Sequence, residues 1–551
     1  MRDAGGGIGP GVVKETAADL IIRGRVITVD PRRPRAEAVA VRDGRIAAVG
    51  AWSEVEGLCG AGTRVVDVGD GCVMPGFIEA HGHPTTEAIM LGRVVDIRPV
   101  TISDAASVIE TIQRTIGERG ADGAYFNGWD ALLQEGLPRP TRAWLDELAP
   151  ETPLVILHNS GHSAYFNTKA AQVAGVSRDT PDPEGASFER DVDGELTGVA
   201  YETAAVVRVM TPGVRLRGGL SGALAAECAQ LNRAGVIACS DMAFNPASRH
   251  GLQRARDHGA ITARLRLYEA STPQMASDST PGAGDDLVRQ IGIKLWADGS
   301  PWIGNIATSF PYLDTPQTRM LGLAPGHHGA MNYQRDEIAR ISEAYFGAGW
   351  QIACHAQGDV AIEAVLDAWE EMLERSPRRD HRMRLEHCGA MTPAQFERAA
   401  RLGVACSIFI DHLWYWGDVL VDGLFGEKHG AHWARAGSAF RAGVRTSFHN
   451  DGGVTRIEPL RNMQVAVTRR SRSGRSLAPE ECVSVEEAIR AQTIDAAYQL
   501  FMDDIVGSVE VGKYADLVVL SRDITSVPVE QIADVEVVAT LLAGQVVSGE
   551  L

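Results

Sequence analysis

Two histidines, His81 and His83, close an apolar run in the segment GFIEAHGHP (residues 76–84). Side chains two positions apart on a β-strand point to the same face, so this spacing presents two imidazoles side by side where a strand ends. Such a pair suits a metal ion. Two polar residues in an ordinary strand-end loop would show the same spacing, so the metal hypothesis depends on partners from elsewhere in the chain.

Residues with metal-binding chemistry also follow later apolar runs. The complete set is His81, His83, Lys294, His355, His387 and Asp451. We expect the first two histidines and the aspartate to bind one ion, and the two later histidines to bind a second. Imidazole together with carboxylate favours zinc, with other divalent first-row ions as the alternative. The set therefore predicts a two-metal hydrolytic centre.

Lys294 has a special place in this set, because two ions about 3.5–4 Å apart need a bridging oxygen donor. An ammonium group has three donors and no acceptor, so it cannot bridge. Lys294 could do so only after carbon dioxide has converted its amine to a carbamate, and burial beside two cations would favour the neutral, reactive amine. The alternative is a structural Lys294 paired with Asp298.

Nine short apolar runs alternate with helical stretches, a pattern that predicts a parallel α/β fold. The runs are GCVMPGFIEAHGH, TPLVILHNS, GVIACSDMA, TARLRLYEA, IGIKLWADG, WQIACHAQG, RMRLEHCGA, GVACSIFID and GVRTSFHND. A TIM-like (β/α)8 barrel holds eight strands, and the first and third runs are too far apart for one βα unit, so we assign TPLVILHNS to an insertion. The six candidate ligands then lie at or near the C-terminal ends of barrel strands, where the active sites of such barrels are built.

Short strands at both ends of the chain predict a further small domain, a β-sandwich to which both ends contribute. The Asp43-Gly44 step between two apolar runs is a hairpin signal within it. The predicted ranges are a disordered tail at 1–17, the sandwich at 18–72 and 505–551, the barrel at 73–94 and 216–504, and an inserted α/β subdomain over the barrel mouth at 95–215.

The composition, 45% hydrophobic and 23% charged, is that of a globular protein. A net charge of −18 argues against nucleic-acid or anionic-membrane partners, and no apolar run approaches the ~20 residues that span a bilayer. The first residues lack the basic and apolar regions of a secretory signal, and the eight cysteines form no Cys-X-X-Cys pair. We therefore expect a cytoplasmic protein without a nucleic-acid or membrane partner.

Taken in order, these motifs resemble the amidohydrolase superfamily of metal-dependent hydrolases. The resemblance is greatest to its N-substituted formamide deformylase-like branch, which has a large insertion after strand one. The matching segments are PGFIEAHGHP, GVIACSDM, IKLWADGSP, CHAQGD, RLEHC, SFHNDGG, GSVEVGKYADLVVL and, in the insertion, SGHSAYFNTKAAQVAG and DGELTGVAYETA. The resemblance covers nearly the whole chain from about Ala18. It implies that the six residues are ligands, although some branches bridge their ions with a cysteine or glutamate and a few bind one ion.

The resemblance further implies a homodimeric hydrolase that cleaves a non-peptide C–N bond by a metal-activated hydroxide. The substrate would be an amide or N-substituted formamide with an apolar or aromatic group. Asp451 would be the catalytic residue that accepts the proton of water and returns it to the departing amine. His162 and His449 are candidates for substrate binding, although His449 could equally be a buried core histidine. The alternatives are hydrolysis of a cyclic amide, a carbamate or an ester, an isomerase or decarboxylase using the same metal chemistry, and a non-catalytic scaffold.

Several neighbouring residues have less specific signals. Cys354 and Cys388 each adjoin a candidate ligand, so strand alternation points their thiols away from the metals. The aromatic run Trp414, Tyr415 and Trp416 follows strand seven, where it could line an apolar pocket or simply pack the loop.

Overall fold

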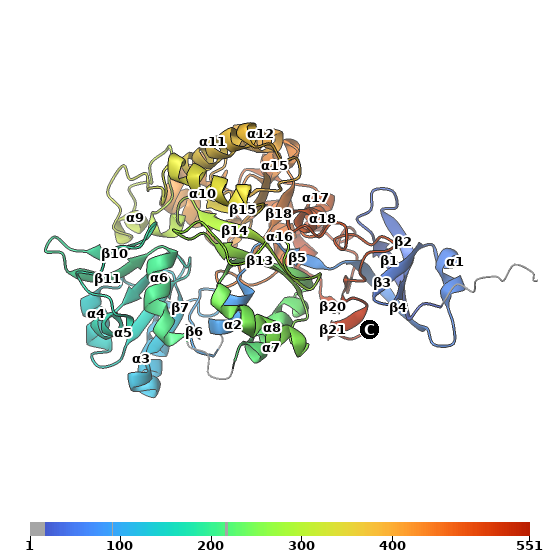
Figure 1. Ribbon diagram of the computed structural model, residues 1–551, viewed down its shortest axis with the longest axis horizontal. Helices are drawn as coiled ribbons and strands as arrows, with labels where there is room; N and C mark the ends of the chain where they lie inside the picture. The colour runs from blue at the N-terminus through green and yellow to red at the C-terminus, as the bar shows by residue number, and fades with distance from the viewer. Residues whose placement is uncertain (1–16, 91, 215–218) are drawn as a thin grey trace, which may run out of the picture.

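The computed structural model describes residues 17–90, 92–214 and 219–551. The predicted tail at 1–17 therefore lies, except for its last residue, outside the described residues. Figure 1 shows a central barrel with the inserted elements at one end of the long axis and the strands β1–β4 at the other. Every helix within the described residues is too short or too polar to cross a membrane.

Eight parallel strands form the barrel, and they are the eight runs left after TPLVILHNS is set aside. Their bounds are β5 (Phe77–Glu79), β12 (Val236–Phe244), β13 (Arg264–Ala270), β14 (Val288–Trp296), β15 (Gln351–Ala356), β16 (Arg384–His387), β17 (Ala405–Ile408) and β18 (Thr446–Phe448). Each strand pairs with its successor in this order. The first and last strands are joined through a side chain, because the backbone N–H of Asn450 donates to Oε1 of Glu79 at 2.9 Å. The predicted (β/α)8 fold class is confirmed.

Helices surround the barrel and bury their apolar faces against its outer surface. The longer ones are α7 (Leu220–Arg233), α8 (Arg249–Asp257), α10 (Arg335–Gly347), α11 (Asp359–Arg375), α12 (Pro393–Leu402) and α16 (Pro459–Thr468). Local signals set some of their starts. In α12, Thr392 and Gln395 form a capping box, and Ser484 with Glu487 forms another at α17 (Val485–Ala491). One large buried apolar cluster lies between these helices and the strands.

The insertion forms its own six-stranded sheet in the order β10-β11-β9-β8-β7-β6. Its strands are β6 (Val95–Asp96), β7 (Ala124–Trp129), β8 (Leu154–His158), β9 (Ser163–Phe166), β10 (Ser187–Arg190) and β11 (Leu196–Tyr201). The helices α3 (Ala105–Arg119), α4 (Arg142–Leu148), α5 (Thr168–Ala174) and α6 (Thr203–Met210) complete it. Two apolar clusters of its own pack this α/β unit. TPLVILHNS supplies β8 here, as predicted.

The two chain ends meet in one mixed sheet of seven strands, ordered β21-β20-β19-β4-β1-β2-β3. Its strands are β1 (Leu20–Ile27), β2 (Arg35–Arg42), β3 (Arg45–Gly50), β4 (Arg64–Pro75), β19 (Leu517–Leu520), β20 (Val537–Leu542) and β21 (Gln545–Gly549). Asp43 and Gly44 both have positive φ, which gives the predicted hairpin between β2 and β3. Side chains from both chain ends share one buried cluster, and a second, smaller cluster lies at β1 and β2. Hydrogen bonding thus makes one continuous sheet, with the pairing of β4 and β19 joining the two ends.

Candidate metal centre

The six predicted ligands all lie at the same end of the barrel. Lys294 is near the end of β14, His355 near the end of β15 and His387 at the end of β16, while the other three follow β5 and β18. Neighbouring strands end at the same height at this end of the barrel, because the parallel register pairs Trp296 with His355 and Ala356 with His387. Parallel pairing therefore places these side chains around one mouth, at the carboxyl ends of the strands.

The backbone at two of these positions is strained. His387 and Asp451 have φ values of 71° and 53°, in the left-handed region that residues other than glycine rarely adopt. Such conformations cost of order 1–3 kcal/mol and are typical of functional sites. After β5 the chain turns through Gly82, where an added Cβ would lie 2.8 Å from Sγ of Cys239. This glycine lets the His81–His83 turn approach β12 closely.

His81, His83 and Asp451 form the first group of side chains that could hold an ion, with ligand atoms within 4.8 Å of one another. Oδ1 of Asp451 is 3.3 Å from Nε2 of His83 and 3.8 Å from Nε2 of His81. Among the described residues this buried oxygen has no hydrogen-bond partner. A buried carboxylate oxygen that faces two imidazole nitrogens without a donor is unfavourable by itself, and a cation there would compensate it. The donor set therefore fits a divalent metal.

The second predicted set, His355 and His387 with Lys294, lies beside the first. The ring centroids of His355 and His387 are 4.4 Å apart, and His387 is 4.6 Å from His81. Nζ of Lys294 is 3.4 Å from Nε2 of His81. His355 belongs to neither of the two compact groups found among the described residues, since the other consists of His81, His387 and His449.

Hydrogen bonds orient the rings of the buried histidines. Nδ1 of His81 contacts Oε2 of Glu386 at 2.6 Å, and Nε2 of His355 contacts the Gly299 carbonyl at 2.7 Å. Nδ1 of His387 is 3.1 Å from Nε2 of His449. The second ring nitrogen of His81, Nε2, faces Lys294 and Asp451, and the second nitrogen of His355 is Nδ1. Nδ1 of His387 also lies 3.9 Å from Oδ2 of Asp451.

Burial sets the protonation of the centre. It lowers the pKa of His81, His355 and His387 well below the usual histidine value, with neighbouring positive groups adding to the effect. These imidazoles are therefore neutral near pH 7, the form that binds metals. Burial also lowers the pKa of Lys294 to about 8. Asp298, the partner in the structural reading of Lys294, instead accepts N–H groups from Ala307, Gln357 and Gly358.

The insertion contributes His162 to the same mouth. The ring centroid of His162 is 4.7 Å from that of His355, and its Nδ1 contacts Oε2 of Glu202 at 2.8 Å. Asn305, in the loop after β14, donates to Oε1 of Glu202 at 2.6 Å. Burial opposes a charged His162, but the Glu202 carboxylate outweighs it and raises the pKa of His162. Glu202 itself has a φ of 65°.

His449 lies deeper than a substrate would reach directly from solvent. It is fully buried and stacks on His81 with ring centroids 4.7 Å apart. Its Nδ1 contacts Oγ of Ser407 at 2.8 Å, and its Nε2 faces His387. These contacts are typical of a buried residue that supports neighbouring ligands. Substrate binding by His449 stays a prediction.

The aromatic residues after β17 were expected either to line an apolar pocket or to pack the loop, and their burial differs. Trp416 is buried, stacks on Trp302 at 4.7 Å and donates to Oδ2 of Asp130 in the insertion. His412 stacks on Phe409 at 4.0 Å, and Phe409 borders His387 at 6.0 Å. Trp414 and Tyr415 are only partly buried, and Trp414 packs under the guanidinium of Arg461.

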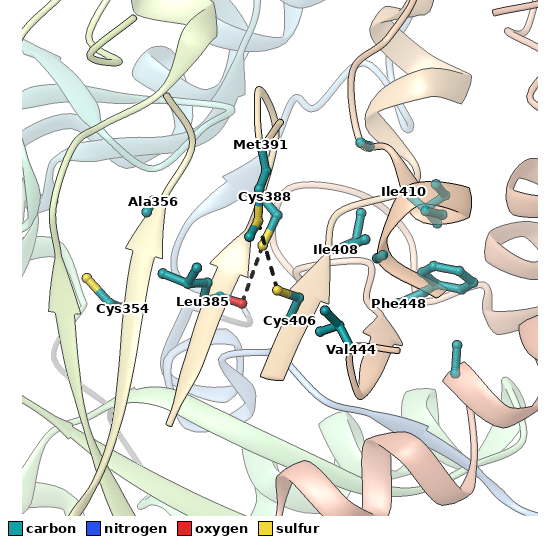
Figure 2. Close-up of a cluster of buried hydrophobic side chains, with 14 of the residues drawn as sticks. Cys354, Ala356, Leu385, Cys388, Met391, Cys406, Ile408, Ile410, Val444 and Phe448 are labelled. Atoms are coloured by element: carbon teal, nitrogen blue, oxygen red, sulfur yellow. Dashed lines mark hydrogen bonds between the residues drawn. The ribbon is translucent and has the colours of Figure 1, made fainter. Parts of the chain in front are cut away.

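The cysteines beside the ligands point into the apolar cluster. Cys354 does so within β15, as strand alternation predicts, and Cys388 does so from just after β16 with a left-handed backbone. Cys354 and Cys388 are both buried there, and Figure 2 shows Cys388 near Cys406 and Met391. Sγ of Cys388 donates to the Leu385 carbonyl at 3.6 Å. The thiols therefore serve packing in this structure.

Comparisons with known proteins agree with this geometry. The model of the Amidohydrolase family matches residues 64–548. An N-substituted formamide deformylase from Arthrobacter pascens is 30% identical over 555 residues, covering 95% of this chain and 97% of that protein. The Protein LONG AFTER FAR-RED 3 of Arabidopsis thaliana is 28% identical, covering 92% and 88%. The structure of an uncharacterized metal-dependent hydrolase from Pyrococcus horikoshii OT3 has the same fold, with a TM-score of 0.71 and 21% identity over 93% of this chain and 99% of that one.

Proposed function

The chain belongs to the amidohydrolase family, and on that premise we propose that it hydrolyses a non-peptide C–N bond in an amide or N-substituted formamide. The relative from Arthrobacter pascens supports this bond type through its name, N-substituted formamide deformylase. The observation that carries the proposal is the buried, unpartnered Oδ1 of Asp451, which faces His81 and His83 at the barrel mouth.

We propose two zinc ions for this donor set. His81, His83 and Asp451 would hold one, and His355 and His387 the other, with Lys294 bridging as a carbamate. When bound, such ions polarise a carbonyl and lower the pKa of water from ~15.7 to about 7. The position of Nζ of Lys294, 3.4 Å from Nε2 of His81, supports a bridging role for its modified amine.

The protein's own side chains would handle the proton and the substrate. Asp451 would accept a proton from water through its carboxylate and pass it to the departing amine, as a base that becomes an acid. His162, held through Nδ1 by Glu202, would offer Nε2 to the substrate above His355. The insertion would cover the reacting bond and exclude bulk water, which strengthens every electrostatic contact inside.

A substrate with an apolar or aromatic group agrees with the walls near this mouth. A cavity between the insertion and the loop after β14 is lined by aromatic and aliphatic side chains, among them Trp129, Tyr165, Tyr201, Ile303, Met320 and Leu321. His158 also lines it and connects to His162 through Ser160, whose Oγ contacts both residues. Its volume is about 30 Å³, room for roughly one water, and none of the six ligands lines it. A substituent would therefore enter only after these side chains move apart.

All eight cysteines are free, including the exposed Cys59, which supports a reducing compartment. We therefore propose a cytoplasmic location.

A substrate screen tests the proposal. Zinc-loaded protein would be offered formamides, amides, lactams, carbamates and esters that share one aromatic substituent, with amine or alcohol release as the readout. We expect the highest kcat/KM for a formamide or simple amide, and loss of at least about 100-fold in an Asp451→Asn variant, because the proton carrier is gone. Preference for a lactam, carbamate or ester would replace the proposed bond type. Absence of turnover on the whole panel would favour the non-catalytic scaffold.

A further inference from the structure

A buried network of hydrogen-bonded ionic side chains contacts His81, the first histidine of the His-X-His pair. Nδ1 of His81 contacts Oε2 of Glu386 at 2.6 Å. Glu386 in turn accepts two hydrogen bonds from Arg384, from Nε at 2.5 Å and from Nη2 at 2.9 Å. Nη2 of Arg384 also donates to the carbonyl of Ala80, the residue just before His81. This network crosses the barrel from β16 to β5, and His81, Arg384 and Glu386 are at most 1% exposed.

The chemistry of these groups fixes the tautomer of His81. The guanidinium has only donors, so both carboxylate oxygens of Glu386 accept from it. The ring nitrogen facing such an acceptor must carry the proton, and a neutral imidazole then keeps its lone pair on the other nitrogen. For His81 that nitrogen is Nε2, which faces Nζ of Lys294 at 3.4 Å and Oδ1 of Asp451 at 3.8 Å.

The other buried ligand candidates have weaker supports behind them. Nε2 of His355 donates to a neutral carbonyl, that of Gly299, and the nearest carboxylate oxygen, on Asp298, is 3.7 Å away. Nδ1 of His387 is 3.1 Å from Nε2 of His449, and the Asp451 carboxylate oxygen Oδ2 is 3.9 Å away, beyond hydrogen-bond distance. A charged acceptor increases the basicity of the imidazole that donates to it, so His81 should be the strongest neutral donor to a metal at this site.

A gain in folding stability does not by itself explain this network of ionic side chains. A buried ion pair gains little or nothing over apolar side chains of similar volume, because desolvation offsets the attraction. Arg384 and Glu386 are fully buried, so their side chains cannot contact substrate either. What they touch is a ligand nitrogen and the backbone that precedes that ligand.

We propose that Glu386 and Arg384 are positioning residues that hold His81 as an Nε2 metal ligand and strengthen its bond to the ion. The proposal rests on the metal-dependent function proposed above. Glu386 sets the tautomer, and Arg384 fixes the carboxylate while anchoring the turn into the ligand through Ala80.

Zinc affinity tests this directly, without a substrate. In a Glu386→Gln variant the amide can present either an acceptor or a donor to His81, so the tautomer is no longer fixed. We expect zinc affinity to fall by about 10–100-fold in competition with a chromogenic chelator. The visible spectrum of the cobalt-substituted protein should change as well, because it reports the ligand field at the ion. An Arg384→Lys variant keeps the charge but loses the bidentate geometry, so its loss of affinity should be smaller.

A matched control is another buried bidentate pair, Arg264 of β13 with Asp516, the residue just before β19. It has the same chemistry, with distances of 2.6 and 3.1 Å, but it lies at the start of β13, the opposite end of the barrel. Asp516→Asn leaves a buried arginine unpaired, as Glu386→Gln does, so both should lower thermal stability. Only Glu386→Gln should weaken zinc binding.

The outcomes separate this inference from the proposed function. Zinc affinity within about twofold of wild type in Glu386→Gln, or equal losses in Glu386→Gln and Asp516→Asn, would overturn the positioning role. If Glu386→Gln does not fold, unchanged affinity in Arg384→Lys would overturn it. A wild-type protein that binds no divalent ion would overturn both proposals. Weakened zinc binding in a protein that hydrolyses nothing on the panel would support the positioning role and refute the proposed function.

Discussion

Replacing Lys294 with Met should stabilise the metal-free protein near pH 7 while abolishing its activity. Lys294 is 1% exposed, and burial lowers its pKa from 10.5 to about 8. At 1.36 kcal/mol per pH unit, this difference corresponds to about 3 kcal/mol of unfolding free energy. Methionine keeps most of the apolar stem and removes the charge, so the variant avoids this cost.

The sign and the pH window follow from the same values. Below about pH 8 the amine is protonated in both folded and unfolded chains, and the folded protein bears the full cost of burying the charge. Between about pH 8 and 10.5 the unfolded chain binds more protons, so wild-type stability rises with pH. Above 10.5 both states are neutral and the cost is gone. The advantage of Lys294→Met should therefore be largest near pH 7 and vanish by about pH 10.5.

Chemical unfolding of both proteins after chelation, followed by tryptophan fluorescence, measures this difference. Taking the difference between variant and wild type cancels the titration of groups that do not interact with Lys294. The buried histidines that do interact with it are neutral from pH 7 upward. Added zinc should reverse the order, because only the wild type gains the binding free energy of a complete centre. A stability difference that stays constant between pH 7 and 10.5 would refute the reasoning, since it would reflect packing and not the charge.

Three further predictions concern the centre and its cover. His83→Ala should lower zinc content from about two ions per chain to one or fewer and remove activity, with the far-UV circular dichroism unchanged; full zinc content by elemental analysis would contradict the ligand assignment. If Lys294 is a carbamate, intact mass measured without acid should be about 44 Da higher than after acid, and wild-type activity in Lys294→Arg would contradict the bridge. Glu202→Gln should free His162 and lower kcat/KM about 10-fold or more at unchanged zinc content. Glu195→Gln, at an exposed carboxylate of the same insertion, is the control and should leave kcat/KM unchanged.

The fold was largely predictable because its signals are local. Each barrel strand is a short apolar run, and the wide separation between the first and third runs was enough to assign β8 to an insertion. The candidate ligands followed from their place at the ends of these runs. The closing contact of Glu79 with Asn450 was not predictable, since it joins residues 371 positions apart through one side chain.

The supporting residues of the site were missed for the same reason. Glu386 lies in the segment RLEH, one position before a predicted ligand, and strand alternation points it to the opposite face from its neighbour. The left-handed φ of His387 breaks that alternation and lets both side chains serve the site. No local pattern indicates that Glu386 meets His81, 305 positions away. A buried carboxylate in an apolar run, with an arginine two positions before it, was the one available signal.

The end of the barrel that holds the candidate ligands departs from ordinary apolar packing. An apolar layer would give a stable barrel interior, yet here the interior holds a buried lysine, an arginine–glutamate pair and several neutral imidazoles. Left-handed backbone at His387, Asp451 and Glu202 adds further cost. Buried ionisable groups that gather at one place indicate selection for chemistry there, because burial of each costs stability. The elements around them follow their local signals closely, and that regular framework offsets the cost and holds the site.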